Sequence, residues 1–304
     1  MPPRSPLPAL RAILKAATAT MATCPALGHV QTRMAEGGAL IAATALDTHC
    51  RVWLPAAVAG PLASLPGPIG LPLAAVLAAL EGHPLPTGVP TLPNEEFPEI
   101  PAVSASVGWS LGLDIVPVLG RVARFASTDD TRTGLNGVHV EIAGDSMRVV
   151  ATDGHRLHVE ILPGDLWIPS DRLLPRAWCL LVARLPWERV SLACDEASQT
   201  VWARGELPGG VRASGGARIQ EGNFPDWPQV IPQTTLREAR FDAAALSAIL
   251  ADCRRVACKD VPVVRLELQN SGVNTATWRA GTAGTGTVEH VGPWDGQGES
   301  LWSE

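Results

Sequence analysis

Apolar and polar positions alternate most clearly after residue 147, where the pattern predicts a β-hairpin. Arg148 to Thr152 has the composition of a strand. The next two residues, Asp153-Gly154, favour a two-residue type I′ turn, because both central positions of that turn need positive φ angles. Beyond the turn a period of two predicts a strand with one face on a core. The apolar residues expected to face that core are Leu157, Val159 and Ile161.

The order of parts around this hairpin occurs a second time near the N-terminus. Residues 27–49 match residues 135–155, and Thr44 and Thr152 are 152 − 44 = 108 residues apart. A second marker, built around Phe-Pro, occurs at 92–101 and again at 221–232. This spacing is too long for a solenoid and indicates tandem copies of a whole domain.

Helical periodicity places at least one helix in each copy. The predicted helices cover residues 9–20, 73–80, 115–125, 171–184 and 243–256. Asp114 and Asp242 are each placed to cap the helix that follows, and the last helix is expected to bury Leu246, Ile249 and Leu250. A strand at 264–268 follows, and the pattern then fades between 280 and 304. The sequence thus predicts an α+β fold with a shortened domain 1–104, a fuller domain 105–234 and a partial domain 235–304.

Composition narrows the functional classes. The chain has 24 Lys and Arg against 30 Asp and Glu, a net charge of −6, which argues against a generally basic nucleic-acid binder but allows a local basic surface. The six cysteines include no C-x-x-C pair, so we expect reduced, buried thiols in a cytosolic protein. Arg11 and Lys15 interrupt the apolar residues 9–22, which favours an amphipathic helix over a signal peptide. No apolar run reaches the roughly 18 residues of a membrane span.

Basic residues gather in the predicted helices, whereas Asp114, Asp171 and Asp242 stand at helix starts, where the helix dipole favours acids. The helices of this acidic protein are therefore net basic. Two interpretations remain open. In the first, arginine is simply a good helix former on the solvated faces of the helices. In the second, the helices together face a polyanion and contact its phosphates without sequence preference.

Four motifs resemble the bacterial sliding clamp family, the beta subunit of DNA polymerase III. They are residues 125–132, 135–138, 150–157 and 221–226. The resemblance is specific over about residues 109–232 and covers only the front half of the family's third domain. It implies the DNA clamp fold, in which each domain pairs two β-α-β-β-β units, and a head-to-tail ring whose helices surround double-stranded DNA.

The resemblance also assigns two sets of residues. The positions that match the family's groove for short linear peptides of polymerases, clamp loaders and repair proteins are Leu135, Thr152, Gly154, His155, Arg156, Leu157 and Pro232. Leucines and a proline beside a hairpin tip would form an apolar slot with polar groups at its edge. The residues expected to face DNA are Arg11, Lys15, Arg121, Arg124, Arg132, Arg172, Arg176 and Arg254.

Several positions depart from the family's pattern. Thr133 and Gly134 replace aromatic or proline residues, two strands with a basic edge are missing between Leu80 and Phe97, and residues 280–287 replace an acidic run. A head-to-tail ring needs two complementary patches. We therefore expect the chain not to close a stable homodimeric ring.

The leading hypothesis is a cytoplasmic sliding clamp that tethers the polymerase to DNA and needs no cofactor or metal. The alternative is a clamp-like peptide-binding protein that forms no closed ring. An enzyme is disfavoured. A hydrolase or metal site would use Asp153, His155 and His158, yet His155 and His158 are three apart in an extended strand and would point to opposite faces.

Overall fold

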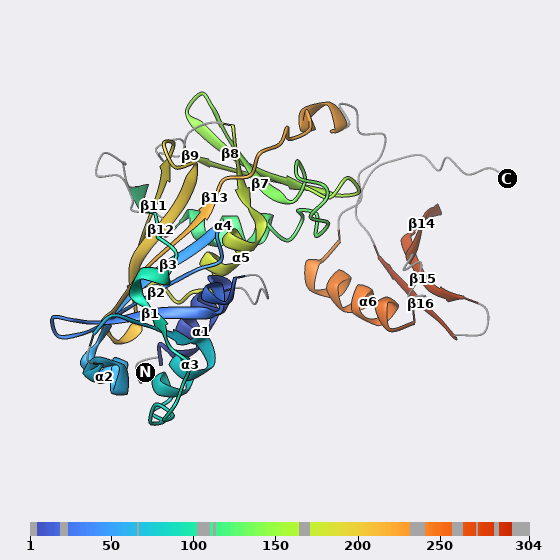
Figure 1. Cartoon of the computed structure of the whole chain (residues 1–304). Coiled ribbons are helices and arrows are strands. Elements are labelled where there is room, and N and C mark those ends of the chain that lie inside the picture. The colour runs from blue at the N-terminus through green and yellow to red at the C-terminus, as the bar shows by residue number, and fades with distance from the viewer. Residues whose placement is uncertain are drawn as a thin grey trace. The chain divides into compact units, whose positions relative to one another are not determined.

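The computed structural model divides into two compact units, Met1–Pro225 and Asp226–Glu304. It describes residues 5–18, 24–65, 67–101, 110–111, 114–163, 171–231, 241–256, 264–271, 273–282 and 286–293. Figure 1 shows the course of the chain. Among the described residues, no helix combines the length and apolarity needed to cross a membrane.

The first half of unit 1 begins with a helix and continues as a β-meander. Its elements are α1 (Leu7–Ala16), β1 (His29–Ala35), β2 (Gly38–Thr44), β3 (Thr48–Pro55), α2 (Ala56–Ala59), β4 (Ile69–Pro72), α3 (Leu73–Leu80) and β5 (Leu92–Pro93). Pro55 and Pro72 are the last residues of the strands that precede α2 and α3. A proline has no backbone N–H to donate to a neighbouring strand, but it is tolerated where a helix begins.

The second half of unit 1 repeats this order with more strands. Its elements are β6 (Ser110–Leu111), α4 (Ile115–Val122), β7 (Gly137–Ala143), β8 (Ser146–Thr152), β9 (Leu157–Pro163), β10 (Arg172–Pro175), α5 (Arg176–Arg184), β11 (Arg189–Asp195), β12 (Thr200–Leu207) and β13 (Val211–Arg218). The predicted helix at 171–184 is therefore wrong in its first turn. Leu173 and Leu174 pair with β7 as a strand, and the helix begins only after Pro175.

One large sheet joins the two halves of unit 1. Its strand order is β5-β4-β1-β2-β3-β13-β12-β11-β6, and a four-stranded sheet has the order β10-β7-β8-β9. The seam between the halves is the antiparallel pair of β3 with β13, in which residues 48–53 lie opposite residues 212–217. The ladder of backbone hydrogen bonds therefore runs unbroken from the first copy into the second.

The helices of unit 1 form a row in which α3 contacts α1, α1 contacts α5 and α5 contacts α4 (Figure 1). Leu10, Ile13 and Leu14 of α1 pack on the inner faces of β1, β2 and β3. Leu119 and Val122 of α4 and Trp178 of α5 pack between the inner faces of both sheets. The helices thus cover one face of the large sheet and leave the opposite face for other contacts.

Helix α4 begins without the cap that the sequence predicts. Asp114 has helical backbone angles and forms no capping hydrogen bond, although α4 itself lies where it was predicted. In contrast, Asp242 caps its helix as predicted, because its Oδ1 accepts the N–H of Ala245 at 2.8 Å.

The described part of unit 2 contains a short 3-10 helix (Trp227–Val230), one α-helix and three antiparallel strands. The α-helix and the strands are α6 (Ala243–Val256), β14 (Val264–Ser271), β15 (Val273–Thr282) and β16 (Gly286–Pro293). Cys253 and Trp278 form its small core, with Leu246 and Ile249 packed against it. Two expectations were wrong here. Leu250 is 41% exposed, and strands continue to Pro293 where the pattern had faded.

Candidate functional site

The loop between β8 and β9 is held by two of its own side chains. Asp153 Oδ1 accepts the N–H groups of His155 and Arg156, both at 3.0 Å, and Asp153 Oδ2 accepts Arg156 Nε at 2.8 Å. Thr152 Oγ1 donates to the Arg156 carbonyl at 2.7 Å and accepts the Gly154 N–H at 3.1 Å. This local network fixes the positions of the predicted groove residues at the hairpin tip.

The connection is not the predicted type I′ turn. Residues 153–156 all lie outside the strands, Thr152 pairs with Leu157, and within this loop only Gly154 has a positive φ, +90°. The Asp153 side chain mimics a backbone turn by accepting the two following N–H groups, so Asp153 keeps an ordinary φ. Partial burial raises the pKa of Asp153, but these hydrogen bonds and the Arg156 guanidinium outweigh burial and leave the pKa below its ordinary value.

Three further contacts, made by two arginines, tie the loop to its surroundings. Arg156 Nη2 donates to the Arg124 carbonyl at 3.1 Å, and its guanidinium lies 5.2 Å from the centre of the Phe125 ring. Arg132 Nη1 donates to the Asp153 carbonyl at 3.3 Å. The loop is therefore ordered before any partner binds, which lowers the entropy cost of binding.

The faces of β9 are the reverse of the prediction. His158, Glu160 and Leu162 lie opposite Ala151, Val149 and Met147, whose side chains are in the core. Leu157, Val159 and Ile161 consequently share the outer face, where Ile161 is 65% exposed. An apolar strip on the outer face of β9 thus starts at the hairpin tip.

Polar residues can occupy the inner face of β9 because α4 supplies their partners. Glu160 accepts Arg121 Nε at 2.8 Å and Arg121 Nη2 at 2.6 Å, and His158 Nε2 lies 3.2 Å from Glu160 Oε1. The His158 ring also stacks on Phe125 at 4.5 Å. The hydrogen bond from Arg121 lowers the pKa of Glu160, with smaller contributions from His158, against the effect of burial.

The other predicted groove residues lie in neighbouring segments. Leu135 is half-buried, and its carbonyl accepts the Ser127 N–H at 2.9 Å. The Phe-Pro marker runs beside this segment, since a side chain at Gly134 would lie 2.6 Å from the Asn223 carbonyl and His139 stacks on Phe224 at 4.7 Å. Only glycine fits at position 134 in this packing. Pro232 lies outside the described residues.

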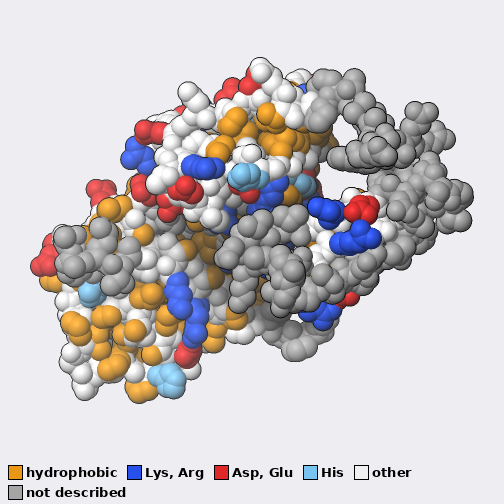
Figure 2. All heavy atoms as spheres, turned by 90° about the vertical axis from the view of Figure 1, so that its right-hand side faces the viewer, with side chains coloured by type: hydrophobic (Ala, Val, Ile, Leu, Met, Phe, Trp, Pro, Cys, Tyr) orange, Lys and Arg blue, Asp and Glu red, His pale blue; other side chains and the backbone are white. Residues whose placement is uncertain are grey.

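The row of helices carries basic residues without acids. The spans of α1, α3, α4 and α5 contain no Asp or Glu, and their basic residues are Arg11, Lys15, Arg121, Arg176 and Arg184. Two of them are neutralised by neighbours, because Arg11 pairs with Glu81 and Arg121 with Glu160. Figure 2 shows that Lys and Arg side chains on one face are interspersed with Asp, Glu and hydrophobic ones.

Four of the expected DNA-facing residues lie outside the spans of these helices. Arg172 is in β10, where its Nη2 donates to Glu196 at 3.1 Å, and its predicted place in a helix was wrong. Arg132 is in the loop after α4 and lies 3.7 Å from Asp129. Arg254 is in α6 of unit 2. Arg124 is exposed just beyond α4, and Arg176 is the first residue of α5.

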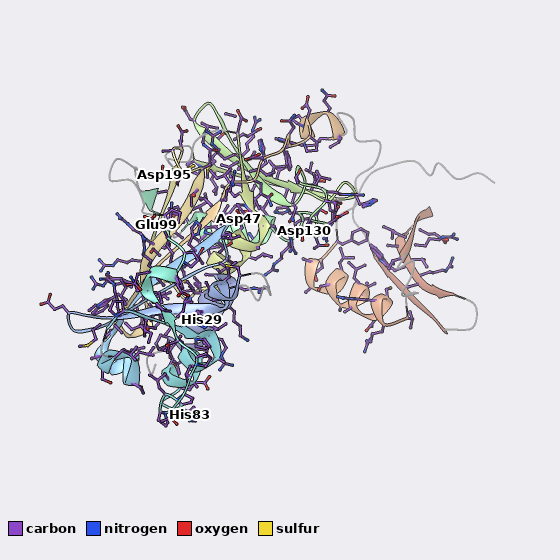
Figure 3. The ribbon with its side chains drawn as sticks, viewed as in Figure 1. His29, Asp47, His83, Glu99, Asp130 and Asp195 are labelled. Carbon is purple, nitrogen blue, oxygen red and sulfur yellow. The ribbon has the colours of Figure 1, made fainter. Side chains whose placement is uncertain are left out.

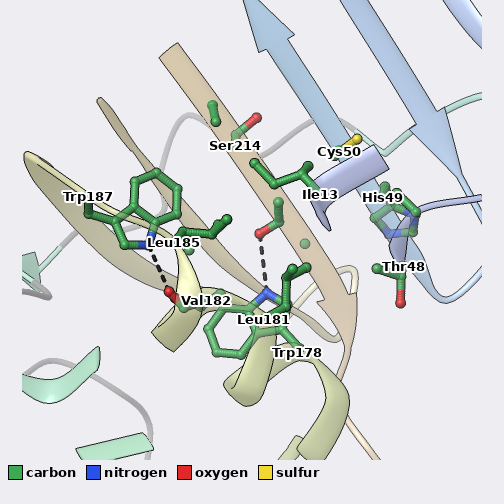
Figure 4. Close-up of a pocket in the computed structure, with 15 residues that line it drawn as sticks. Ile13, Thr48, His49, Cys50, Trp178, Leu181, Val182, Leu185, Trp187 and Ser214 are labelled. Carbon is green, nitrogen blue, oxygen red and sulfur yellow. Dashed lines mark hydrogen bonds between the residues drawn. The ribbon is translucent and has the colours of Figure 1, made fainter. Parts of the chain in front are cut away.

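Several histidines and carboxylates of unit 1 lie far from one another. Figure 3 labels six of them at separate places on different segments, namely His29, Asp47, His83, Glu99, Asp130 and Asp195. A cavity of about 20 Å³ between α1, α5 and the large sheet holds His49 beside Cys50 and Trp178 (Figure 4). Burial lowers the pKa of His49, and burial raises the pKa of Cys50 to about 12. Both groups are thus held in their neutral forms.

The structure brings together one group of metal-binding side chains that the sequence did not suggest. Atoms of His139, Glu141 and Asp171 lie within 4.8 Å of one another. His139 and Glu141 are two apart in β7 and share a face, which is the signal in the sequence that could have found them. The group could hold a cation, but Arg148 already pairs with Glu141 at 3.1 Å. Asp153, His155 and His158, considered from the sequence, form no such group among the described residues.

The comparisons with known proteins point to one family. Residues 115–176 match the family model described as DNA polymerase III beta subunit, central domain. The beta sliding clamp of Pseudomonas aeruginosa is 32% identical over 153 residues, which are 47% of this chain and 39% of the relative. That of Vibrio cholerae is 28% identical over 217 residues, or 67% of this chain and 57% of the relative. The chain spans about half the length of the curated relatives it matches.

Solved structures extend the likeness to most of the chain. The DNA polymerase III beta subunit of Thermotoga maritima aligns with a TM-score of 0.75 at 21% identity, over 96% of this chain and 83% of that one. A sliding clamp of Pseudomonas aeruginosa bound to griselimycin gives the same TM-score, 0.75, at 20% identity. The predicted α+β clamp fold is thereby confirmed. The chain is similar in sequence to bacterial beta sliding clamps over part of their length and has their fold.

Proposed function

We propose that the chain acts without catalysis as a cytoplasmic clamp-like protein that holds double-stranded DNA and binds short peptides of polymerase and clamp-loader subunits. The observation that carries this proposal is the row of four helices, whose spans contain basic residues and no acids. Such a surface suits phosphate contacts that do not depend on base sequence. In this proposal residues 1–104, 105–234 and 235–304 correspond to successive clamp domains.

The peptide site is proposed at the tip of the β8–β9 hairpin. Five of the groove residues lie within residues 152–157 there, namely Thr152, Gly154, His155, Arg156 and Leu157, and Leu135 and Pro232 are assigned to the same groove by resemblance. The ordered loop and the apolar outer face of β9 support this assignment. A short peptide would bury a few apolar side chains against Leu157 and exchange hydrogen bonds with the loop.

Titration with a labelled peptide tests the groove. A peptide with a glutamine followed by apolar residues should bind. Leu157→Lys should raise the dissociation constant of this peptide about tenfold or more, because it places a charge in the apolar strip. Met34→Lys is the control, since Met34 is a 56% exposed apolar residue on β1. Equal loss in both variants, or no binding to the unmodified chain, would refute the groove.

The DNA surface is tested by the salt dependence of binding. Lys15→Glu combined with Arg184→Glu should weaken binding to duplex DNA of any sequence and reduce the slope of log K against log salt by about 2. Arg218→Glu is the control, because Arg218 is exposed at the end of β13, outside the helix row. A slope that stays unchanged in the double variant would contradict the proposed surface.

The ion pairs at Arg11 and Arg121 favour a second candidate function. Together with Arg172 on β10, they leave fewer cations available to DNA than the sequence suggested. A clamp-like peptide-binding protein that forms no closed ring would need none of them. Sedimentation with circular DNA separates the two functions, because only a ring stays on the circle and slides off after linearisation.

A further inference from the structure

The face of the large sheet opposite the helices carries two rows of mostly polar residues across four neighbouring strands. The strands are β3, β13, β12 and β11 in that order (Figure 1). Pairing places one residue of each strand in each row. The first row is Arg51–Ser214–Arg204–Ser191, and the second is Trp53–Arg212–Glu206–Arg189.

These rows line an open hollow of about 580 Å³. Its lining contains four arginines and a single acid, Glu206, together with Trp53 and Leu40 at the β2–β3 side. The protein as a whole has a net charge of −6, so the lining of this hollow is more basic than the chain on average. The hollow spans three strand spacings from β3 to β11, or about 14 Å. A peptide of about four extended residues has this length.

Contacts within the protein hold three of the arginines that line the hollow. Arg189 directs its Nε and Nη2 to Glu206 Oε2, at 3.3 and 2.7 Å. The Arg212 guanidinium lies 4.1 Å from the centre of the Trp53 ring. Arg51 Nη2 donates to the Ile100 carbonyl at 2.8 Å, and burial together with nearby Arg33 lowers the pKa of Arg51. Arg51 and Arg212 are thus held in place by uncharged groups, whereas Arg189 is paired with Glu206.

We propose that this hollow is a docking site for an acidic peptide segment with one apolar side chain, distinct from the peptide groove and the DNA surface. Carboxylates of the peptide would pair with Arg51 and Arg212, as Glu206 already pairs with Arg189. The apolar side chain would lie against Leu40 and the edge of Trp53. A single-stranded nucleic acid fits less well, because the Arg212 guanidinium occupies the Trp53 ring on which a base would stack.

Fluorescence anisotropy with the full chain tests this site. The probe is a fluorescein-labelled peptide rich in Glu with one Leu, and the comparison ligands are the same peptide with Gln for Glu and an oligo-dT of similar length. Arg212→Gln should weaken binding of the acidic peptide about fivefold, and Glu206→Gln should strengthen it by a similar factor, because it removes the only acid among the lining residues. A variant that merely damages the fold would not bind more tightly.

Arg218→Gln is the matched control, since Arg218 is an exposed arginine of the same strand β13 outside the hollow. It should change the affinity less than twofold. The proposal fails if Glu206→Gln does not strengthen binding, if Arg218→Gln weakens it as much as Arg212→Gln, or if oligo-dT or the Gln peptide binds as tightly as the acidic peptide. Binding of the acidic peptide should weaken as salt is added, and this result would support the proposal.

Discussion

At the scale of single residues, the partners of a side chain decide its place more than its polarity does. His158 and Glu160 lie on the inner face of β9 because His158 stacks on Phe125 and Glu160 forms an ion pair with Arg121. Satisfied polar groups can be buried at small cost, whereas an unpaired carboxylate could not. Since successive side chains of a strand point to opposite faces, Leu157 and Val159 lie on the outer face, beside the candidate peptide groove.

The pair of Glu160 and Arg121 makes stability depend on pH. The folded pKa of Glu160 is lowered, so its contribution is fully present above the unfolded value of about 4.3 and is lost as pH falls through the folded pKa. Glu160→Gln should therefore be less stable than the unmodified chain at pH 7, and the difference should shrink below about pH 4. Denaturant unfolding at both pH values measures this. Glu221→Gln, which alters an 86% exposed partner of Arg218, should show no such trend.

At the scale of elements, the sequence predicts what local rules determine and misses what distant partners determine. Helix 243–256 was correct because Asp242 caps it and its apolar spacing is regular. The strand β10 was missed because its pairing with β7 is a contact across more than 30 residues, about which local periodicity carries no information. The outer position of Leu157 was missed for the same reason, since period two fixes alternation but not which face is inside.

The packing of α4 on α5 depends on one glycine. A Cβ at Gly120 would lie 2.4 Å from the Cβ of Ala183. Gly120→Ala gains up to about 1 kcal/mol of helix propensity, but overpacking costs about 1–3 kcal/mol, so net destabilisation is expected. Adding Ala183→Gly should recover part of the loss, because it restores the space. Chemical denaturation of both single variants and the double variant gives the coupling; strictly additive losses would contradict this close approach.

At the scale of the whole chain, the tandem copies read from the sequence are not separate in the structure. At the β3–β13 seam, strands from before and after the boundary that the repeat suggested pair in one sheet. The hydrophobic core also spans the two copies. Leu207, Val211 and Ala213 of the second copy pack in one cluster with Val52 and Leu54 of the first. Internal sequence repeats can define copies, but they carry no information about which strands join them.

Unit 1 is therefore expected to open as one cooperative body, and Gly216 at the seam gives the means to test it. A Cβ at Gly216 would lie 2.8 Å from ring atoms of Trp202, which is fully buried. Gly216→Val should clash with Trp202 on β12 and distort β13 where it pairs with β3, at a cost of about 1–3 kcal/mol or more. Hydrogen exchange should then accelerate together in β1–β3 and in β11–β12, because both depend on the seam. Gly215→Ala is the control, since a Cβ there meets only the His49 carbonyl at 3.8 Å. Loss of protection confined to one half would show that the copies fold separately despite their common sheet.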